Sequence, residues 1–307
     1  MKLCFIGDIH GKVNTPNDYL LDYNEDLFNQ LEWVKQYCEQ NNIQNIFHLG
    51  DIFDKPEATD DWKNKFINQW KDFKGTFYSI IGAAHDLFYN KENSYDRTCL
   101  RNLELAGALK VLNNTKIILD NVGITSVSPD IKIAKQQIKN LSLNCQYEII
   151  LAHQFYNWGF DKSAGFENED FDNLNRPCSL ILGHDHHQYK EVSIKNVTIF
   201  RPGSFMRTEL SESTIKMKPR ILIFDEDRFY YVEIPHRDIN EIYNVAAYKL
   251  NKSKAFKEIK NNIKDISEYL NKDADILRCS DFLKEVNCPI EEFQYLKTLH
   301  QVRGQEF

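Results

Sequence analysis

The first two thirds of the chain alternate between short apolar runs and segments in which apolar residues recur at helical spacing. Three of the apolar runs have the length and flanking residues of buried strands, and they lie at residues 3–7, 45–50 and 76–81. Helical spacing follows each of the first two runs, over about 24–41 and then at Trp62, Phe66, Trp70 and Phe73. This alternation predicts a largely parallel sheet covered by helices.

Further strands are expected at 116–119, 122–127, 147–152, 178–182, 189–193, 196–200, 220–224 and 229–234. The last four lie close together with hairpin-like spacing, which predicts a second, mixed sheet. After Pro235 the strand pattern ends, and helices are predicted at 249–270, 275–286 and 290–300, the first of them rich in lysine. We therefore expect one domain over 1–235 and a small helical region over 236–307.

Composition is ordinary for a soluble globular protein, with 42% hydrophobic and 27% charged residues. No apolar stretch approaches the ~20 residues that span a membrane, and the N-terminus has no signal-peptide pattern. The seven cysteines form no CxxC pair, which indicates free thiols in a reducing compartment. These features predict a cytoplasmic protein. The net charge of −7 disfavours a surface that grips nucleic acid throughout, but it allows a local site where metal ions supply positive charge.

Each of the three early strands ends in a glycine followed by potential metal ligands. Asp8 and His10 follow the first strand, Asp51 the second, and His85 with Asp86 the third. The carboxyl ends of neighbouring parallel strands meet at one edge of a sheet, where open α/β folds place their sites. These side chains are therefore expected to lie close together.

Three more histidines come at or just after later strands. His153 ends one strand, and His184 and His186 follow another at a spacing that lets the two imidazoles face different sides of one site. Carboxylates and imidazoles without thiolates suit manganese, iron or zinc. The combined set exceeds the needs of one ion and suits two ions about 3.5–4 Å apart that share a carboxylate.

Other polar residues near these clusters have structural interpretations. His48 lies inside an apolar run and is predicted to be a core histidine, not a ligand. Asp185 and His187 flank ligands and are predicted to support them. A single strand-end histidine such as His153 is by itself more often structural. It is the succession of five clusters, each behind an apolar strand, that indicates a site.

The order Asp-x-His, Gly-Asp, Gly-x-His-Asp, His and Gly-His-x-His resembles the calcineurin-like metallophosphoesterase superfamily over roughly residues 1–235. This resemblance implies an α/β fold in which two mixed β-sheets pack as a sandwich flanked by helices. Within the superfamily, the sequences GDIFD, HDL and FRPGSFMRTEL, the last at 200–210, are similar to SbcD-type DNA-repair nuclease subunits.

The resemblance implies six metal ligands in all, namely Asp8, His10, Asp51, His153, His184 and His186. One ion would bind Asp8, His10 and His186, and the other would bind His153 and His184. Asp51 would bridge the two ions. A metal-bridging hydroxide would then attack phosphorus in line. The implied cofactors are two divalent ions, Mn2+ before Fe2+, Mg2+ or Zn2+.

The resemblance also implies catalytic and substrate-binding residues. His85 would stabilise charge on the phosphoryl group or protonate the leaving oxygen, with Asp86 orienting its ring. Arg201, Ser204 and Arg207, in or just after the PGS sequence, are expected to bind substrate.

Ala84 is a departure from the superfamily pattern. That pattern usually has Asn directly before this histidine, and the Asn side chain is a ligand of the second metal ion. Alanine has no donor atom, so weaker metal binding is expected at that position. Asn90 or Asn93 in the following loop could replace the missing ligand.

Three hypotheses of function follow. The first is a metal-dependent phosphodiesterase, a DNA exonuclease or endonuclease subunit of an SbcCD-like complex, with DNA, an SbcC-like ATPase and a second copy of the chain as partners. The C-terminal region would then cap the site or dock the ATPase, and its lysines could face DNA phosphates. The second is a stand-alone phosphoesterase for nucleotides or small phosphate esters, which the acidic net charge favours. The third is a binding subunit whose catalysis is impaired by Ala84.

Overall fold

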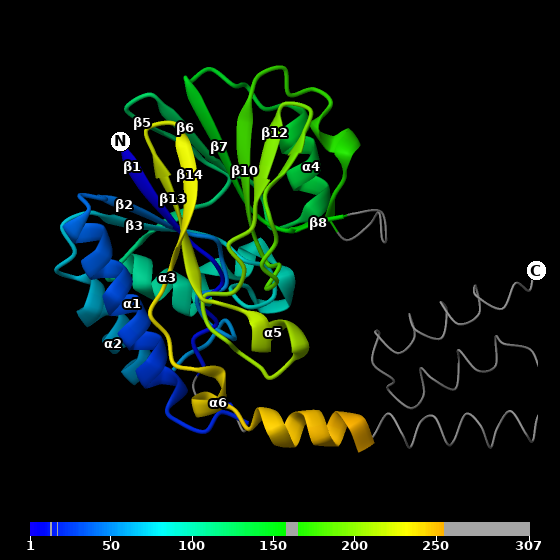
Figure 1. Ribbon diagram of the computed structural model, residues 1–307. Coiled ribbons are helices and arrows are strands. Elements are labelled where there is room, and N and C mark those ends of the chain that lie inside the picture. The colour runs from blue at the N-terminus through cyan, green and yellow to red at the C-terminus, as the bar shows by residue number, and fades with distance from the viewer. Residues whose placement is uncertain (13, 17, 158–164, 255–307) are drawn as a thin grey trace, which may run out of the picture. The chain divides into compact units, whose positions relative to one another are not determined.

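The protein is described by a computed structural model over residues 1–12, 14–16, 18–157 and 165–254. The chain divides into two compact units, Met1–Val245 and Ala246–Phe307. The first unit contains two six-stranded sheets and a two-stranded sheet (Figure 1). All of the expected ligands lie in this unit.

The first sheet has the strand order β14-β13-β1-β2-β3-β4. Its members are β1 (Lys2–Ile6), β2 (Asn45–His48), β3 (Thr76–Ile80), β4 (Lys110–Leu112), β13 (Arg220–Asp225) and β14 (Arg228–Glu233). Strands β1 to β4 are parallel, whereas β13 runs antiparallel to both β1 and β14. The sheet is therefore mixed.

The second sheet has the strand order β11-β12-β10-β7-β6-β5. Its members are β5 (Lys116–Leu119), β6 (Val122–Ser126), β7 (Tyr147–His153), β10 (Cys178–Gly183), β11 (Val192–Ile194) and β12 (Val197–Phe200). The central pairs are parallel and the two edge pairs antiparallel. Beside this sheet, β8 (Phe155–Tyr156) pairs with β9 (Gly165–Phe166).

Helices cover the outer faces of the two sheets (Figure 1). On the first sheet these are α1 (Tyr23–Gln40), α2 (Asp60–Trp70) and α3 (Cys99–Leu105), and on the second α4 (Ile131–Lys139). The short elements are α5 (Glu212–Lys216), α6 (Ile239–Ile242) and the 3-10 turns η1 (Phe88–Asn90), η2 (Glu92–Arg97) and η3 (Asn168–Phe171).

Residue alternation along β1 explains the layered core. Leu3 and Phe5 face the second sheet, while Cys4 and Ile6 face the helices, because successive side chains of a strand point to opposite faces. All four side chains are fully buried. A strand buried on both faces must be apolar throughout, as this run is. The expected sandwich of two mixed sheets flanked by helices is therefore confirmed.

The main departure from the sequence predictions concerns β13 and β14. The spacing placed the last four strands together in the second sheet, but only β11 and β12 join it. The hairpin of β13 and β14 instead extends the first sheet beside β1. The strand expected at 189–193 begins later, at Val192. Helices α3 and α4 and strand β4 were not predicted, because their apolar patterns are short.

Residues 236–245, assigned from the sequence to the C-terminal region, pack on the first unit. Tyr243 is fully buried, and its ring lies 5.2 Å from that of Tyr19. Residues 245–254 are helical. The remainder of the helix expected at 249–270 and both later helices lie outside the described residues. No helix in the described part of the chain is long and apolar enough to cross a membrane.

Candidate metal centre

The expected ligands converge where the carboxyl ends of the two sheets meet. Strands β1 and β2 deliver ligands from the first sheet, β7 and β10 deliver them from the second, and His85 follows β3. Four of the residues are almost completely buried, namely Asp8, His10, Asp51 and His153. The side chain of His186 is 42% exposed, so the cluster opens to the surface on that side.

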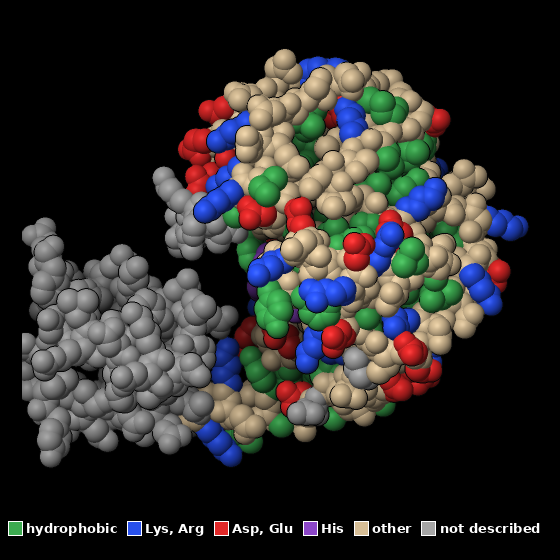
Figure 2. Space-filling model, turned by 180° about the vertical axis from the view of Figure 1, so that it is seen from behind, with side chains coloured by type: hydrophobic (Ala, Val, Ile, Leu, Met, Phe, Trp, Pro, Cys, Tyr) green, Lys and Arg blue, Asp and Glu red, His purple; other side chains and the backbone are tan. Residues whose placement is uncertain are grey.

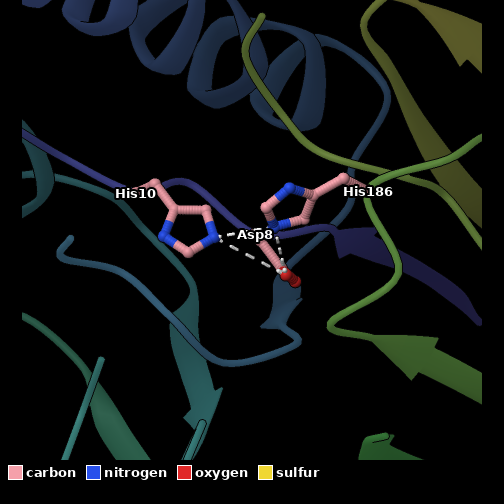
Figure 3. A group of neighbouring side chains, drawn as sticks. All are labelled: Asp8, His10 and His186. Atoms are coloured by element: carbon pink, nitrogen blue, oxygen red, sulfur yellow. Dashed lines mark hydrogen bonds and ion pairs between the residues drawn. The ribbon is translucent and has the colours of Figure 1, made fainter. Parts of the chain in front are cut away.

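Donor atoms form three groups, each with atoms within 4.8 Å of one another. The groups are Asp8, His10 and His186; His10, Asp51 and His85; and Asp51, His153 and His184. Figure 3 shows the first, in which His10 and His186 point their rings at the Asp8 carboxylate. Asp51 contributes to two of the groups. The structure thus brings together the residues predicted for two ions and places Asp51 between them.

The donor atoms fit divalent cations. His10 Nε2 and His186 Nε2 are 2.9 Å apart, and Asp8 Oδ2 lies 3.4 Å from the latter. Two imidazole nitrogens and a carboxylate oxygen that converge in this way surround one point, as ligands of a cation do. Asp51 Oδ1 is buried and accepts no hydrogen bond from the described residues. A buried oxygen left so costs about 1–3 kcal/mol unless a cation or water compensates it.

Three of the ligands have left-handed backbones, with φ of 47° at His10, 61° at Asp51 and 73° at His184. This conformation is unfavourable for residues other than glycine and costs on the order of 1 kcal/mol or more each. It turns the chain sharply off β1, β2 and β10, so that each side chain points back into the centre. Gly82 is needed for a different reason, lack of space, since a Cβ there would lie 1.9 Å from Asp51 Oδ1.

Hydrogen bonds fix the orientation of the inner ligands. His153 Nδ1 donates to the Leu49 carbonyl over 2.8 Å, which leaves Nε2 directed at Asp51 Oδ2, 3.0 Å away. The backbone N–H of His184 donates to both carboxylate oxygens of Asp8. Such outer contacts hold a ligand in one tautomer and one direction.

The centre has carboxylates that remain ionised, and two of its histidines, His10 and His184, remain neutral. Burial opposes ionisation of Asp8, but the charge of His153 and a hydrogen bond from His186 outweigh it and lower the pKa. The pKa of Asp51 is likewise lowered, chiefly by His153 against the opposing effect of burial. Burial lowers the pKa of His10 to about 4. These are the protonation states that metal ligands require.

His153 carries the compensating positive charge when no cation is bound. Burial alone would lower its pKa, but Asp51 and Asp8 reverse the effect and raise it to about 10. A bound cation and a proton on His153 are therefore alternatives, because both neutralise the same two carboxylates.

His85 lies next to the ligands, as expected, but its orientation comes from an unexpected residue. Its ring is 4.6 Å from that of His10, and its Nδ1 donates to the backbone carbonyl of Asp54 over 2.7 Å. The Asp54 carboxylate in turn pairs with Lys12 Nζ at 2.9 Å. Asp54 stands three residues after Asp51 in the sequence, but nothing in the pattern indicated that its carbonyl would face His85.

Asp86 therefore does not orient His85, contrary to the expectation from the resemblance. Its Oδ2 accepts hydrogen bonds from the backbone N–H groups of Asp51 and Gly82, at 2.9 and 2.7 Å. Burial and the charge of Asp51 raise the pKa of this carboxyl to about 7. Asp86 clamps the turn after β2 to the turn after β3, and so positions Asp51 and not His85.

The three residues expected to bind substrate are buried, with exposures of 1% for Arg201, 2% for Ser204 and 6% for Arg207. Ser204 donates its N–H to the His186 carbonyl and its hydroxyl to the Met206 carbonyl. The Arg201 guanidinium lies over the Tyr189 ring at 4.1 Å. These contacts hold the loop that carries the last ligands, and substrate binding by the three residues stays a prediction.

A substitution can test whether Arg207 has a structural role or binds substrate. Its guanidinium donates to the carbonyls of Met217 and Arg237. Arg207→Ala leaves these carbonyls without their donor, so we expect the free energy of unfolding to fall by about 2–4 kcal/mol, measured by urea denaturation. The exposed Arg228 provides a matched control. A raised KM with unchanged stability would instead show that Arg207 contacts substrate.

His48 is a core histidine, as predicted. It is fully buried, and its Nδ1 lies 3.0 Å from Ser79 Oγ on the neighbouring strand. Burial lowers its pKa from 6.5 to about 3.

The unfolded chain therefore takes up a proton on His48 at a pH where the folded chain does not. Protonation of His48 does not affect the free energy of unfolding above pH 6.5. Below that pH it lowers the free energy of unfolding by about 1.4 kcal/mol per pH unit, until the pH approaches 3. His48→Asn, which can keep the bond to Ser79, should flatten this dependence. Denaturation between pH 6.5 and 4.5 in chelator tests it, and an unchanged slope would contradict it.

Ala84 lies on the exposed turn between Gly82 and His85, a turn closed by the bond from the Leu87 N–H to the Ala83 carbonyl. Asn90, considered as a replacement ligand, is exposed in η1 with a φ of 56°. Asn93 is also exposed. A role for either asparagine as the replacement ligand stays a prediction.

The fold and the site define a phosphoesterase of the two-metal class, and comparison with known proteins agrees. Residues 1–188 match the family described as calcineurin-like phosphoesterase, and the chain belongs to that family. The family implies a metal-dependent hydrolase with two divalent ions, and the donor groups above provide for them.

Among solved structures, the chain is similar to TT1561 of Thermus thermophilus, with a TM-score of 0.50 and 10% identity over 76% of this chain and 99% of that one. It is also similar to a dimetal phosphatase from Danio rerio, with a TM-score of 0.49 and 11% identity over 78% and 97%. At this identity, the likeness to TT1561 shows the fold alone.

A curated relative is the uncharacterized protein YvnB of Bacillus subtilis (strain 168), which is 36% identical over 67 residues. The match covers 22% of this chain and 5% of YvnB, so the chain spans a small part of that relative's length.

Proposed function

We propose that this chain is a phosphodiesterase that cleaves DNA with two divalent ions, Mn2+ before other metals, in the manner of SbcD-type nuclease subunits. The observation that carries the proposal is Asp51, which lies between two groups of converging donor atoms, with His85 beside one of them. When bound, the ions would supply an activated water and neutralise charge on the phosphoryl oxygens.

The chain's own residues have separable tasks in this reaction. Asp8, His10 and His186 would hold one ion, and His153 and His184 the other, with Asp51 shared. His85 keeps a hydrogen on Nδ1 for the Asp54 carbonyl, so its Nε2 is the atom that gains or loses a proton. In its cationic form, His85 can therefore donate from Nε2 to the leaving oxygen.

Two features support a long substrate. His186, with 42% of its side chain exposed, and the exposed Ala84 leave the centre open to the surface, where a polymer could pass. In Figure 2, basic and acidic side chains are interspersed over the face seen from behind. Because this face does not present a purely basic surface, the attraction for DNA would come from the cations at the metal centre, which offset the net charge of −7.

Cleavage assays with Mn2+ test the proposal on linear duplex DNA, circular single-stranded DNA and a bis-aryl phosphodiester. We expect DNA cleavage that is lost in His85→Ala. Cleavage of the small ester alone would favour the second candidate, a stand-alone phosphoesterase, which the acidic net charge supports.

Ala84→Asn tests the third candidate, a binding subunit with impaired catalysis. The substitution adds an oxygen donor before His85 and is expected to tighten metal binding, as measured by calorimetric titration of Mn2+. If the wild-type chain turned over no substrate with any metal and Ala84→Asn restored activity, the missing ligand at position 84 would be the cause of the impaired catalysis. Activity in the wild type would exclude this candidate.

An SbcC-like ATPase and a second copy of the chain are proposed as partners on the same resemblance. Light scattering after gel filtration measures the oligomeric state, and a dimer is the expected result. Co-purification with the ATPase subunit tests the interaction with that partner. The capping or docking role of the C-terminal region remains a prediction, as does the cytoplasmic location.

A further inference from the structure

Phe155 is an exposed aromatic residue in direct contact with the candidate metal centre. Its ring centroid lies 4.2 Å from that of His184, at an interplanar angle of 58°. His184 lies in turn 4.9 Å from the ring of His153. Although it packs on a buried cluster, Phe155 remains 37% exposed. An apolar ring surface therefore faces solvent beside the ligands.

The backbone holds this ring in place. Phe155 begins β8, which pairs in parallel with β9 so that Phe155 lies opposite Gly165. A Cβ on Gly165 would lie 2.4 Å from the Phe155 carbonyl oxygen, so the two strands approach closely at this point. The next side chain, Tyr156, turns inward and is 6% exposed. Strand alternation thus directs Phe155 towards the centre and Tyr156 into the core.

Isolated exposed apolar residues are common and need no explanation. Phe155 differs because its partly exposed ring contacts His184, a donor of the Asp51 group, and a phosphate bound at that group would lie beside it. The group next to that phosphate in a nucleic acid is a nucleoside, whose flat base is suited to stack on an aromatic ring.

We propose that Phe155 is a stacking platform for the nucleobase next to the scissile phosphate, and that it makes the centre selective for nucleotidyl diesters. The inference rests on the proposed function and deepens it, since it names the chemical group that is recognised. Stacking on aromatic side chains tolerates every base, so selectivity for a nucleobase without selectivity for sequence is expected.

The test compares thymidylyl dinucleotides with analogues in which one nucleoside is abasic, on either side of the phosphate. For the wild type with Mn2+, kcat/KM should be about 5- to 150-fold higher when the base is present on the recognised side. Phe155→Leu keeps an apolar side chain without a ring, and it should bring this ratio close to one. Phe155→Trp should maintain or raise the ratio, and this second variant keeps the test valid if Phe155→Leu fails to fold.

Tyr230→Leu is the matched control. Tyr230 is 40% exposed on β14, which β13 separates from β1, and its removal should leave the ratio unchanged. A wild type that cleaves both dinucleotides equally would overturn the inference and leave the proposed function standing. A ratio that survives in Phe155→Leu would also overturn it, because an apolar contact without stacking would then suffice.

Binding gives a readout that does not depend on turnover. Calorimetry with thymidine 5′-monophosphate and deoxyribose 5-phosphate should show about 10-fold tighter binding of the nucleotide by the wild type, lost in Phe155→Leu. If no diester is cleaved, the proposed function fails, and this difference in affinity still decides the role of Phe155. Equal affinities would overturn it.

Discussion

Asp51→Ala is expected to lower kcat/KM for phosphodiester cleavage by about 1,000-fold or more, because this one carboxylate serves two of the three groups of converging donors. Among the described residues, only Asp51 and His10 belong to two of these groups, and Asp51 is the one that contributes a negative charge. Its charge also sets the protonation state of His153, so the whole centre changes with it. Cleavage assays and metal content by mass spectrometry measure the effect together.

Two further variants make the result interpretable. Asp51→Asn keeps the size of the side chain and tolerates the left-handed backbone, with φ of 61°, that alanine adopts less readily. It should lose activity and metal as Asp51→Ala does. Asp170→Asn removes another buried carboxylate, one that pairs with Lys135 and Lys139 instead, and should keep both. Intact activity in Asp51→Ala would refute the two-metal assignment.

Removal of divalent metal is expected to lower the midpoint of thermal unfolding by about 10–20 °C, since two ions held at 100 times their Kd contribute about 5 kcal/mol. The physical reason is that Asp8 and Asp51 are ionised and buried side by side, with His153 as the main compensating charge. Calorimetry or fluorescence with and without EDTA measures the shift. Readdition of Mn2+ should reverse it.

Asp51→Asn provides the control for this effect as well. It lacks the shared charge, so EDTA should change its midpoint much less than that of the wild type. A wild-type midpoint that stays constant while mass spectrometry shows metal loss would mean that the cluster binds no structurally important cation.

The ligands that follow strands could be predicted from the sequence because two local rules apply at the same positions. Apolar runs such as 3–7 report buried strands, and a sharp turn after a parallel strand places the next polar residues at one edge of the sheet. These two rules are enough to bring Asp8, His10 and Asp51 together. The same rules predicted that His48 is not a ligand, since it lies inside an apolar run and does not follow the end of one.

The sheet to which each strand belongs was harder to predict from the sequence. The hairpin of β13 and β14 has the same local pattern as that of β11 and β12, yet it pairs with β1, over two hundred residues earlier in the chain. Hairpin spacing reports which strands are neighbours in sequence. It carries no information on which sheet edge the hairpin will join.

The sequence by itself determined the class of fold, the residue types at the centre and the absence of a donor at Ala84, because these depend on periodicity and on side-chain chemistry. Tertiary structure alone decided how the supporting residues act. Asp86 bonds backbone N–H groups of Asp51 and Gly82, while the Asp54 carbonyl orients His85. It also decided that Arg207 bonds the Met217 carbonyl and that the Phe155 ring contacts His184. Such roles depend on which atoms from distant segments come within hydrogen-bonding or van der Waals distance, and a linear pattern does not specify that.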